Sequence, residues 1–185
     1  MFDRFSGPTG KRLRFDAFLN QKLVGGDKDL AAELVEMAEL IPVKAGEIII
    51  QQDGTDNDLY FIITGAFDIT VNSTRIRQRG PGDSVGEMAA VEPIQKRSAT
   101  VSAAEDSIVG KITEAQLTEL ASHYPDIWRR MAKELSKRLM ERNHFVNRRR
   151  DKIRVFVISS TEAIPVARLL QAEFAHDPFL TVPWN

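Results

Sequence analysis

Short runs of β-branched and aromatic residues, each bounded by Gly, Asp or Asn, fill the middle of this 185-residue chain. The run at 66–72 alternates strictly, which places Phe67, Ile69 and Val71 on one face of an expected strand. Many short runs separated by turn residues predict a sandwich or a barrel-like roll. The expected strands cover residues 46–52, 59–65, 66–72, 74–80, 99–103 and 107–112.

Helical periodicity precedes and follows these strands. Residues 8–23 and 27–40 predict two N-terminal helices, and Asp27 is the expected N-cap of the second. After the last short strand, Thr113 and Gln116 have the spacing of a capping box, which predicts the start of another helix.

A long helix is expected from residue 126 to residue 149. Apolar residues recur along it at steps of four and three, a coiled-coil-like seam that predicts pairing into a homodimer or a higher oligomer. Residues 126–152 carry ten Lys or Arg against four Asp or Glu, a balance of +6. This basic stripe is either a nucleic-acid surface or the solvated face of the helix. The seam consists of Trp128, Ala132, Leu135, Leu139, Arg142 and Val146.

Residues 152–160, 161–177 and 179–184 predict a strand, a helix and a strand. One β-α-β unit cannot bury both faces of a sheet, so we interpret it as the start of a second domain. The predicted fold class is α+β. It comprises an antiparallel, jelly-roll-like β-roll with flanking N-terminal helices and a long C-terminal helix, followed by the first β-α-β of an α/β domain. The expected domain boundaries are 1–40, 41–149 and 150–185.

Composition excludes several classes of site. The chain has no cysteine, which rules out a disulfide framework and thiolate metal ligands, and its three histidines are far apart. We therefore expect no metal. No apolar run approaches the roughly 20 residues of a membrane span, so we expect a cytoplasmic protein without a membrane partner.

The residues with the clearest chemistry are the segment GPGDSVGEMAA at 80–90 and the segment RSATV that starts at Arg97. A guanidinium fork and the backbone N–H groups of a short helical turn suit a compact phosphate monoanion. Gly86 lets the backbone approach the phosphate closely, and Glu87 can accept a hydrogen bond from a ribose 2′-hydroxyl. Arg97 is expected to offset both negative charges. The alternative is that Glu87 and Arg97 form a surface ion pair.

The pattern G-E-M-A followed by R-S-A-T resembles the phosphate-binding cassette of the cyclic-nucleotide-binding domain family. The segments VKAGEIII (43–50) and LYFIITG (59–65) and the helix that ends in Tyr-Pro-Asp also fall where that family has them. The resemblance covers about residues 40–145 and implies a cyclic mononucleotide as ligand. The implied ligand-binding residues are Val85, Gly86, Glu87, Met88, Ala89, Arg97, Ser98, Ala99, Thr100, Arg142 and Asn143.

Within this family the long helix closes over the pocket, and the resemblance places Arg142 and Asn143 opposite the base. An Arg-Asn pair suits uracil or guanine better than adenine. The alternative is that the aliphatic part of Arg142 packs against the protein while its guanidinium reaches water, and both hypotheses stay open. Phe67 and Ile69 are expected to fill the roll rather than to stack on a base.

The residues after the long helix resemble the first strand, helix and strand of a bacterial TIR-like domain, not a helix-turn-helix. This argues against a transcription factor and against a nucleic-acid partner. The combination resembles the TIR effectors of Pycsar, the bacterial cyclic-pyrimidine anti-phage system. That resemblance implies cyclic UMP as activating ligand, cyclic CMP second, NAD as substrate of the full-length protein, and no catalytic residue within these 185 residues. The alternative is a cyclic AMP or cyclic GMP responsive regulator whose tail docks a partner or DNA.

Overall fold

The computed structural model describes residues 2–5, 7–149, 153–158, 161–174 and 179–184. The helices are η1 (Phe2–Phe5), α1 (Gly7–Leu19), α2 (Lys28–Met37), α3 (Glu87–Val91), α4 (Glu114–His123), α5 (Asp126–Arg149), η2 (Thr161–Ala163) and α6 (Ile164–Glu173). The strands are β1 (Glu39–Val43), β2 (Ile48–Ile50), β3 (Leu59–Thr64), β4 (Phe67–Val71), β5 (Thr74–Arg79), β6 (Ser84–Val85), β7 (Thr100–Ala103), β8 (Ser107–Ile112), β9 (Ile153–Ile158) and β10 (Phe179–Trp184). The chain divides into two units, of which the first ends at Arg138 and the second begins at Leu139.

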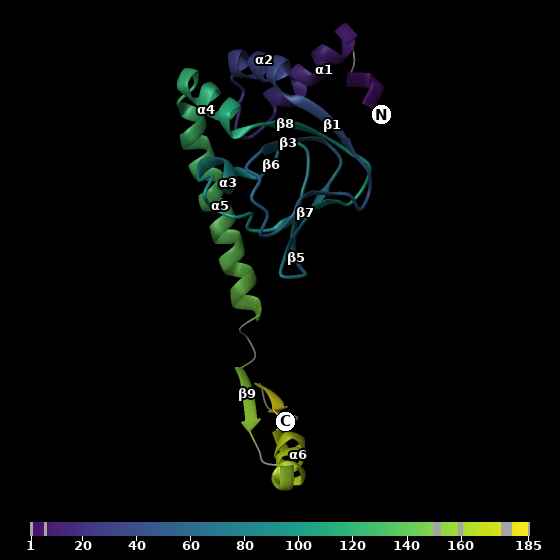
Figure 1. Cartoon of the computed structure of the whole chain (residues 1–185), viewed down its shortest axis with the longest axis vertical. Coiled ribbons are helices and arrows are strands. Elements are labelled where there is room, and N and C mark those ends of the chain that lie inside the picture. The colour runs from purple at the N-terminus through teal and green to yellow at the C-terminus, as the bar shows by residue number, and fades with distance from the viewer. Residues whose placement is uncertain (1, 6, 150–152, 159–160, 175–178, 185) are drawn as a thin grey trace. The chain divides into compact units, whose positions relative to one another are not determined.

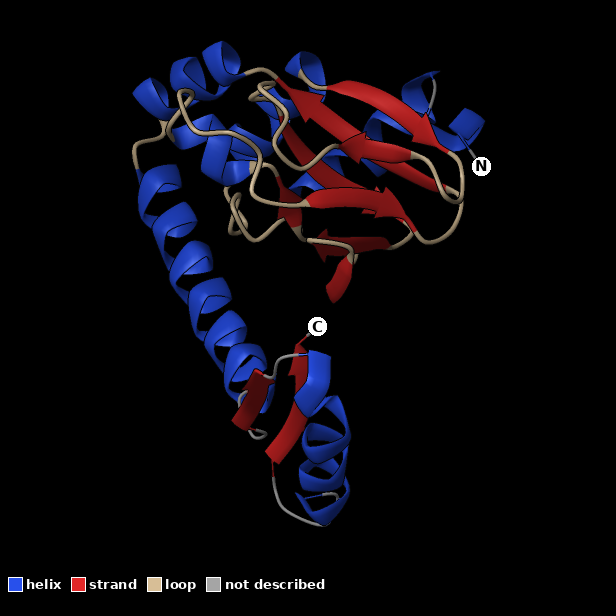
Figure 2. Cartoon of the chain, turned by 60° about the horizontal axis from the view of Figure 1, so that its bottom comes forward, coloured by secondary structure: helices blue, strands red, loops and turns tan. Residues whose placement is uncertain are grey.

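Two antiparallel sheets form the roll of the first unit (Figure 2). One has the strand order β1-β8-β3-β6 and the other has the order β2-β7-β4-β5. Helices α1, α2 and α4 gather at one end of this roll (Figure 1). The predicted α+β class and the antiparallel roll with flanking helices are confirmed.

Strand β3 is buried on both faces and divides the interior into two apolar clusters. Leu59, Phe61 and Ile63 pack against the helices, whereas Tyr60 and Ile62 pack between the two sheets. Side chains of a strand alternate between its faces, so a strand between two cores needs apolar residues at every position. The uninterrupted run LYFII at 59–63 meets this requirement.

Helices cover the outer face of the sheet that contains β3. The ring of Phe18 in α1 meets the ring of Phe61 edge to face, with centroids 5.7 Å apart. Ile127 and Met131, in the first two turns of α5, are also buried in this cluster. Asp27 caps α2 as expected, since its Oδ1 accepts from the backbone N of Leu30 at 3.1 Å.

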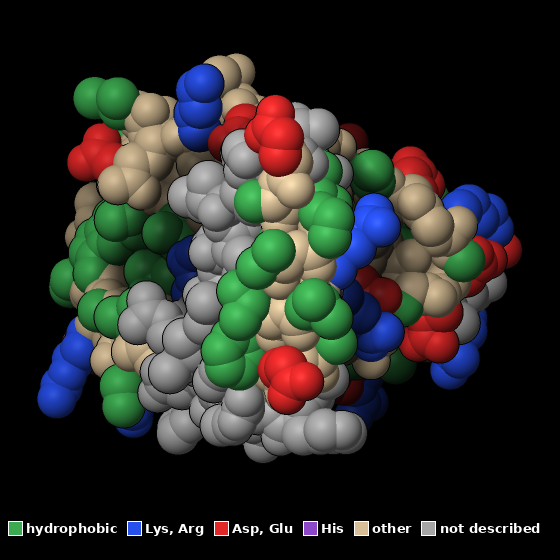
Figure 3. Space-filling view, turned by 90° about the horizontal axis from the view of Figure 1, so that it is seen from below, with side chains coloured by type: hydrophobic (Ala, Val, Ile, Leu, Met, Phe, Trp, Pro, Cys, Tyr) green, Lys and Arg blue, Asp and Glu red, His purple; other side chains and the backbone are tan. Residues whose placement is uncertain are grey.

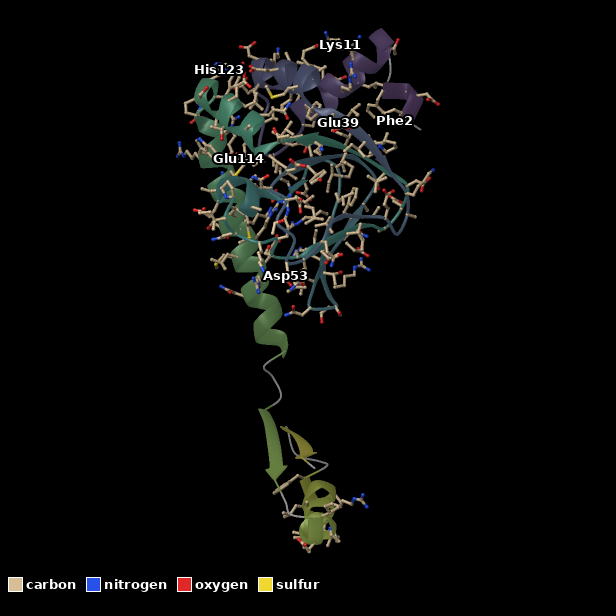
Figure 4. The ribbon with its side chains drawn as sticks, in the orientation of Figure 1. Phe2, Lys11, Glu39, Asp53, Glu114 and His123 are labelled. Carbon is tan, nitrogen blue, oxygen red and sulfur yellow. The ribbon has the colours of Figure 1, made fainter. Side chains whose placement is uncertain are left out.

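Ion pairs join the helices at the surface of this end. Figure 4 labels one residue of each pair, Lys11 and His123. Lys11 of α1 lies 2.5 Å from Glu36 of α2, and its hydrogen bond lowers the pKa of the Glu36 carboxyl. Nδ1 of His123 in α4 lies 3.4 Å from Glu33, also in α2. These exposed contacts contribute little compared with the apolar cluster beneath them.

The structure corrects the end of the second predicted helix. Helix α2 ends at Met37, and residues 39–40, which we expected to be helical, belong to β1. There Leu40 pairs with Gly110 of β8, because a new edge strand satisfies the backbone groups of β8. Pro42 is tolerated in β1 because that strand lies at the edge of its sheet.

Helix α5 has the predicted bounds, but its predicted seam is mostly exposed. Trp128 and Leu139 are 38% and 60% exposed, and only Leu135 packs partly against the helical cluster. The side chain of Val146 lies outside the described residues. The exposed side chains of Trp128 and Leu139 therefore form an apolar strip on α5.

In the second unit, β9 and β10 pair in parallel from Ile153↔Phe179 to Ile158↔Trp184. Helix α6 is the crossover that a parallel pair requires, so the predicted strand-helix-strand order is confirmed. Ala167 on α6 is buried, whereas other apolar side chains of α6 are exposed. These exposed residues are Val166, Leu169 and Leu170. Figure 3 shows hydrophobic side chains gathered near the centre of its view.

Gly110 provides a test of the packing beside β8. A Cβ at this position would lie 2.7 Å from Cζ of Phe18, a ring that is fully buried. We expect Gly110→Ala to lower the free energy of unfolding by about 1–3 kcal/mol, because the ring has no space to move. Urea denaturation measures this. In the control Gly80→Ala the new Cβ would come no closer than 3.8 Å to another atom. Equal stability of the two variants would contradict the packing.

Candidate functional site

The turn at residues 84–87, where β6 leads into α3, is the centre of the candidate site. Its Gly86 has φ +98°, a conformation that residues with a side chain rarely adopt. A Cβ there would lie 2.6 Å from the carbonyl oxygen of Asp58 and 2.8 Å from Nη1 of Arg97. Glycine thus allows the 84–87 turn to pass directly against the guanidinium of Arg97.

The side chain of Arg97 is 2% exposed and contacts the 84–87 turn and the loop before β3. Its Nη1 donates to the carbonyl oxygen of Gly86 at 3.0 Å, and its Nη2 donates to that of Asp58 at 2.8 Å. Nε and Nη2 both donate to Oδ2 of Asp56, with Nε at 3.0 Å. The guanidinium is therefore held in place by one carboxylate and two main-chain carbonyls.

Glu87 is buried, with 3% exposure, and its carboxylate pairs with a different arginine from the one we expected. The hydroxyl of Ser84 donates to Oε1 of Glu87, and Nη1 of Arg138 donates to Oε2 at 2.6 Å. Nη2 of Arg138 donates to the carbonyl oxygen of Ser84 at 2.9 Å. The expected charge balance between Arg97 and Glu87 is thus replaced by two separate pairs, and neither Glu87 nor Arg97 is a surface residue.

The other residues of the predicted cassette differ in burial. Val85 and Ala89 are buried, and Val85 packs between the sheets. Met88 and Ser98 are exposed, with the hydroxyl of Ser98 3.5 Å from the Met88 sulfur. The side chains of Val85 and Ala89 therefore contribute to packing in the interior.

Strand β7 begins at the edge of the cassette. Ala99 is half-buried, and the hydroxyl of Thr100 accepts from the backbone N of Gln52 at 3.0 Å and from Nε2 of Gln51 at 3.3 Å. Thr100 thus joins β7 to the loop after β2, the same loop that contains Asp56 further along the chain.

Carboxylates on this loop shift the pKa values of neighbouring titratable groups. Burial raises the pKa of the Tyr60 phenol, and the carboxylates of Asp58 and Asp56 raise it further. Burial alone would lower the pKa of Lys111, but Asp58 and Glu39 outweigh it and raise that pKa. Tyr60 is therefore neutral and Lys111 charged at pH 7.

Arg142 and Asn143 belong to the second unit, and both side chains are exposed. Their proposed contact with a base stays a prediction.

Sequence reasoning missed Arg138, Ser84 and Asp56 as members of this site. A signal for Arg138 was present, because it continues the buried stripe of Ile127, Met131 and Leu135 at helical spacing. Asp56 offered no signal, since its contact with Arg97 joins residues 41 positions apart through a loop.

Comparison with protein families matches residues 40–124 to the family described as cyclic nucleotide-binding domain. This part of the chain is a cyclic nucleotide-binding domain. The matched range contains the 84–87 turn and Arg97. It ends before Arg138, so the contact between Arg138 and Glu87 lies partly outside the matched range.

The whole chain is similar to several bacterial proteins. It is 78% identical over 185 residues to the Pycsar effector protein BcPycTIR of Burkholderia cepacia and 44% identical over 185 residues to the Pycsar effector protein XpPycTIR of Xanthomonas perforans. The chain spans 61% of the length of each of these relatives.

Solved structures share the fold. The match to a cAMP-bound PfPKA-R has a TM-score of 0.62 at 20% identity and covers 72% of this chain and 47% of that one. The catabolite activator protein of Thermus thermophilus gives a TM-score of 0.61 at 21% identity, covering 69% of this chain and 62% of that one. At this identity the likeness concerns the fold, and function must be argued from the site.

Proposed function

We propose that this chain is a cyclic-nucleotide sensor that binds a 3′,5′-cyclic pyrimidine nucleotide, with cyclic UMP favoured and cyclic CMP second. The main support is the buried 84–87 turn, which has a guanidinium on one side and a carboxylate at its end. The pyrimidine is supported by the resemblance to the Pycsar TIR effectors and by the names of the two relatives.

Phosphate recognition falls to Arg97 and to main-chain N–H groups. Arg97 has five N–H donors, and Asp56, Asp58 and Gly86 accept four of its hydrogen bonds. A cyclic phosphate would be paired with this arginine while N–H groups of Gly86 to Ala89 supply further donors. Asp56, whose side chain is 46% exposed, would share Arg97 with the phosphate.

Ribose and base recognition complete the proposed site. Glu87 would accept from the ribose 2′-hydroxyl. Arg142 and Asn143 would contact the exocyclic carbonyls and the ring N–H of the base. Ser98 to Thr100 would border the phosphate, as the family resemblance implies.

The second unit would transmit binding to an output. We propose that its parallel pair and α6 begin a TIR-like domain that cleaves NAD in anti-phage defence when the nucleotide binds. The resemblance and the relatives, named PycTIR, support this assignment. The exposed apolar residues of α6 would pack against the remainder of such a domain.

The apolar strip on α5 supports a homodimer. Trp128 and Leu139 are exposed at coiled-coil spacing, which is unfavourable unless a second copy covers them. Leu139→Asp tests this better than a change at Leu135, because Leu135 also packs in the helical cluster. Light scattering should give a dimer for the wild type and a monomer for Leu139→Asp, with Lys137→Asp as control. A wild type that stays monomeric at high concentration would refute the dimer.

Arg97→Ala tests the phosphate site. Leaving the ligand charge unpaired should cost about 3–5 kcal/mol, which is a loss of affinity for cyclic UMP of roughly a hundredfold to several thousandfold. Titration calorimetry measures it, and circular dichroism checks the fold. Lys96→Ala is the control, because it removes an adjacent exposed charge. If Arg97→Ala and Arg97→Lys both bind like the wild type, the proposed site is wrong.

Arg142→Ala tests base recognition. Loss of a hydrogen bond to the base should weaken cyclic UMP binding by about 1–3 kcal/mol. The fold should be unchanged, since Arg142 is exposed. The same titration with Lys133→Ala controls for charge on α5. If Arg142→Ala and the wild type bind cyclic UMP, CMP, AMP and GMP with equal affinity, other residues recognise the base.

A further inference from the structure

Arg138 connects α5 to both ends of the 84–87 turn. One arm of its guanidinium reaches the Glu87 carboxylate at 2.6 Å, and the other reaches the carbonyl oxygen of Ser84 at 2.9 Å. A guanidinium that binds two acceptors at once orients its carboxylate partner as well as offsetting the charge of that partner. The position of the Glu87 carboxylate therefore depends on a residue of α5.

The Glu87 carboxylate has capacity for a third donor. Its two oxygens offer about four acceptor positions, and Ser84 and Arg138 each use one of them. A ribose hydroxyl can therefore bind this carboxylate while Arg138 remains in place. Without Arg138, the carboxylate would be buried with a single neutral donor, an unfavourable state that favours movement of the side chain.

The docking of α5 does not depend on Arg138 alone. Ile127 and Met131 are buried, and Nη1 of Arg130 donates to the carbonyl oxygens of Leu23 and Val24. These contacts hold the first two turns of the helix. Arg138 lies two turns after Arg130, where the described contacts of α5 reach the candidate ligand site.

We propose that Arg138 is a positioning residue for ribose recognition: it orients Glu87 so that the site selects a ribonucleotide, and it makes that selection depend on α5. This inference rests on the proposed function. Because coupling between two binding events is reciprocal, a ligand with a 2′-hydroxyl should also stabilise α5 around Arg138, and a 2′-deoxy ligand should do so less.

The test compares cyclic UMP with its 2′-deoxy analogue by titration calorimetry. The wild type should bind cyclic UMP about tenfold to a hundredfold more tightly, the range for a hydrogen bond to a charged acceptor. Arg138→Met should lose most of this preference through weaker binding of cyclic UMP, while affinity for the 2′-deoxy analogue changes little. Arg138→Lys should restore part of the preference, since it keeps the charge but not the fork.

Lys137→Met is the matched control, because it removes an exposed charge from the adjacent position of α5. It should keep the wild-type preference. If Arg138→Met weakens both ligands equally, or keeps the wild-type preference, Arg138 has no role in ribose selection. A wild type that binds both sugars equally would also overturn the inference, but would leave phosphate recognition standing. A chain that binds no cyclic nucleotide would overturn the proposed function itself.

Hydrogen exchange gives a second readout. With both ligands at saturation, amides of α5 around Arg138 should exchange more slowly in the cyclic UMP complex than in the 2′-deoxy complex. Arg138→Met should abolish this difference. Identical exchange of the two wild-type complexes would show that the ribose hydroxyl is not coupled to α5, contrary to the inference.

Discussion

Two arginines, which both follow the 84–87 turn in the sequence, hold that turn in place. Arg97 binds the carbonyl oxygen of Gly86, and Arg138 binds the carbonyl oxygen of Ser84 and the carboxylate of Glu87. Gly86 makes this arrangement possible, because a side chain there would collide with Arg97 and with the carbonyl of Asp58. Hydrogen bonds thus hold the turn without a ligand, and such preorganisation reduces the entropy lost on binding.

Within the roll, strand β3 positions the 84–87 turn. β6 pairs with β3 at Tyr60↔Val85 and Phe61↔Ser84, so the turn begins at a strand that is buried on both faces. A change in the packing of β3 would shift Ser84 and with it the start of the turn. The helical cluster also buries the start of α5, and this sets the direction from which Arg138 reaches the turn. The fold thus positions the four residues of the 84–87 turn through one strand, β3, and one helix, α5.

The sequence predicted most of the architecture because its signals were local. The cap at Asp27 and the capping box at Thr113 each act within one element, and the structure contains both. Residues 66–72 contain the expected strand, β4, but of its side chains only Phe67 is buried and the next four are all half-buried. The boundary between α2 and β1 was missed because pairing with β8 decides it. The partners of Glu87 and Arg97 were missed for a similar reason: Arg138 and Asp56 reach them from 51 and 41 residues away. Helical spacing could place Arg138 on the packed face of α5, but no short-range pattern identifies Glu87 as its partner.

Titration calorimetry of the unmodified 185-residue chain with cyclic UMP, CMP, AMP and GMP tests whether the 84–87 turn and Arg97 bind a cyclic pyrimidine nucleotide. We expect one cyclic nucleotide to bind per chain and cyclic UMP to bind most tightly, with cyclic CMP second. Binding of cyclic AMP or cyclic GMP in preference to both pyrimidines would contradict the assigned ligand. Failure of all four to bind would contradict the claim that the 84–87 turn and Arg97 form a nucleotide site.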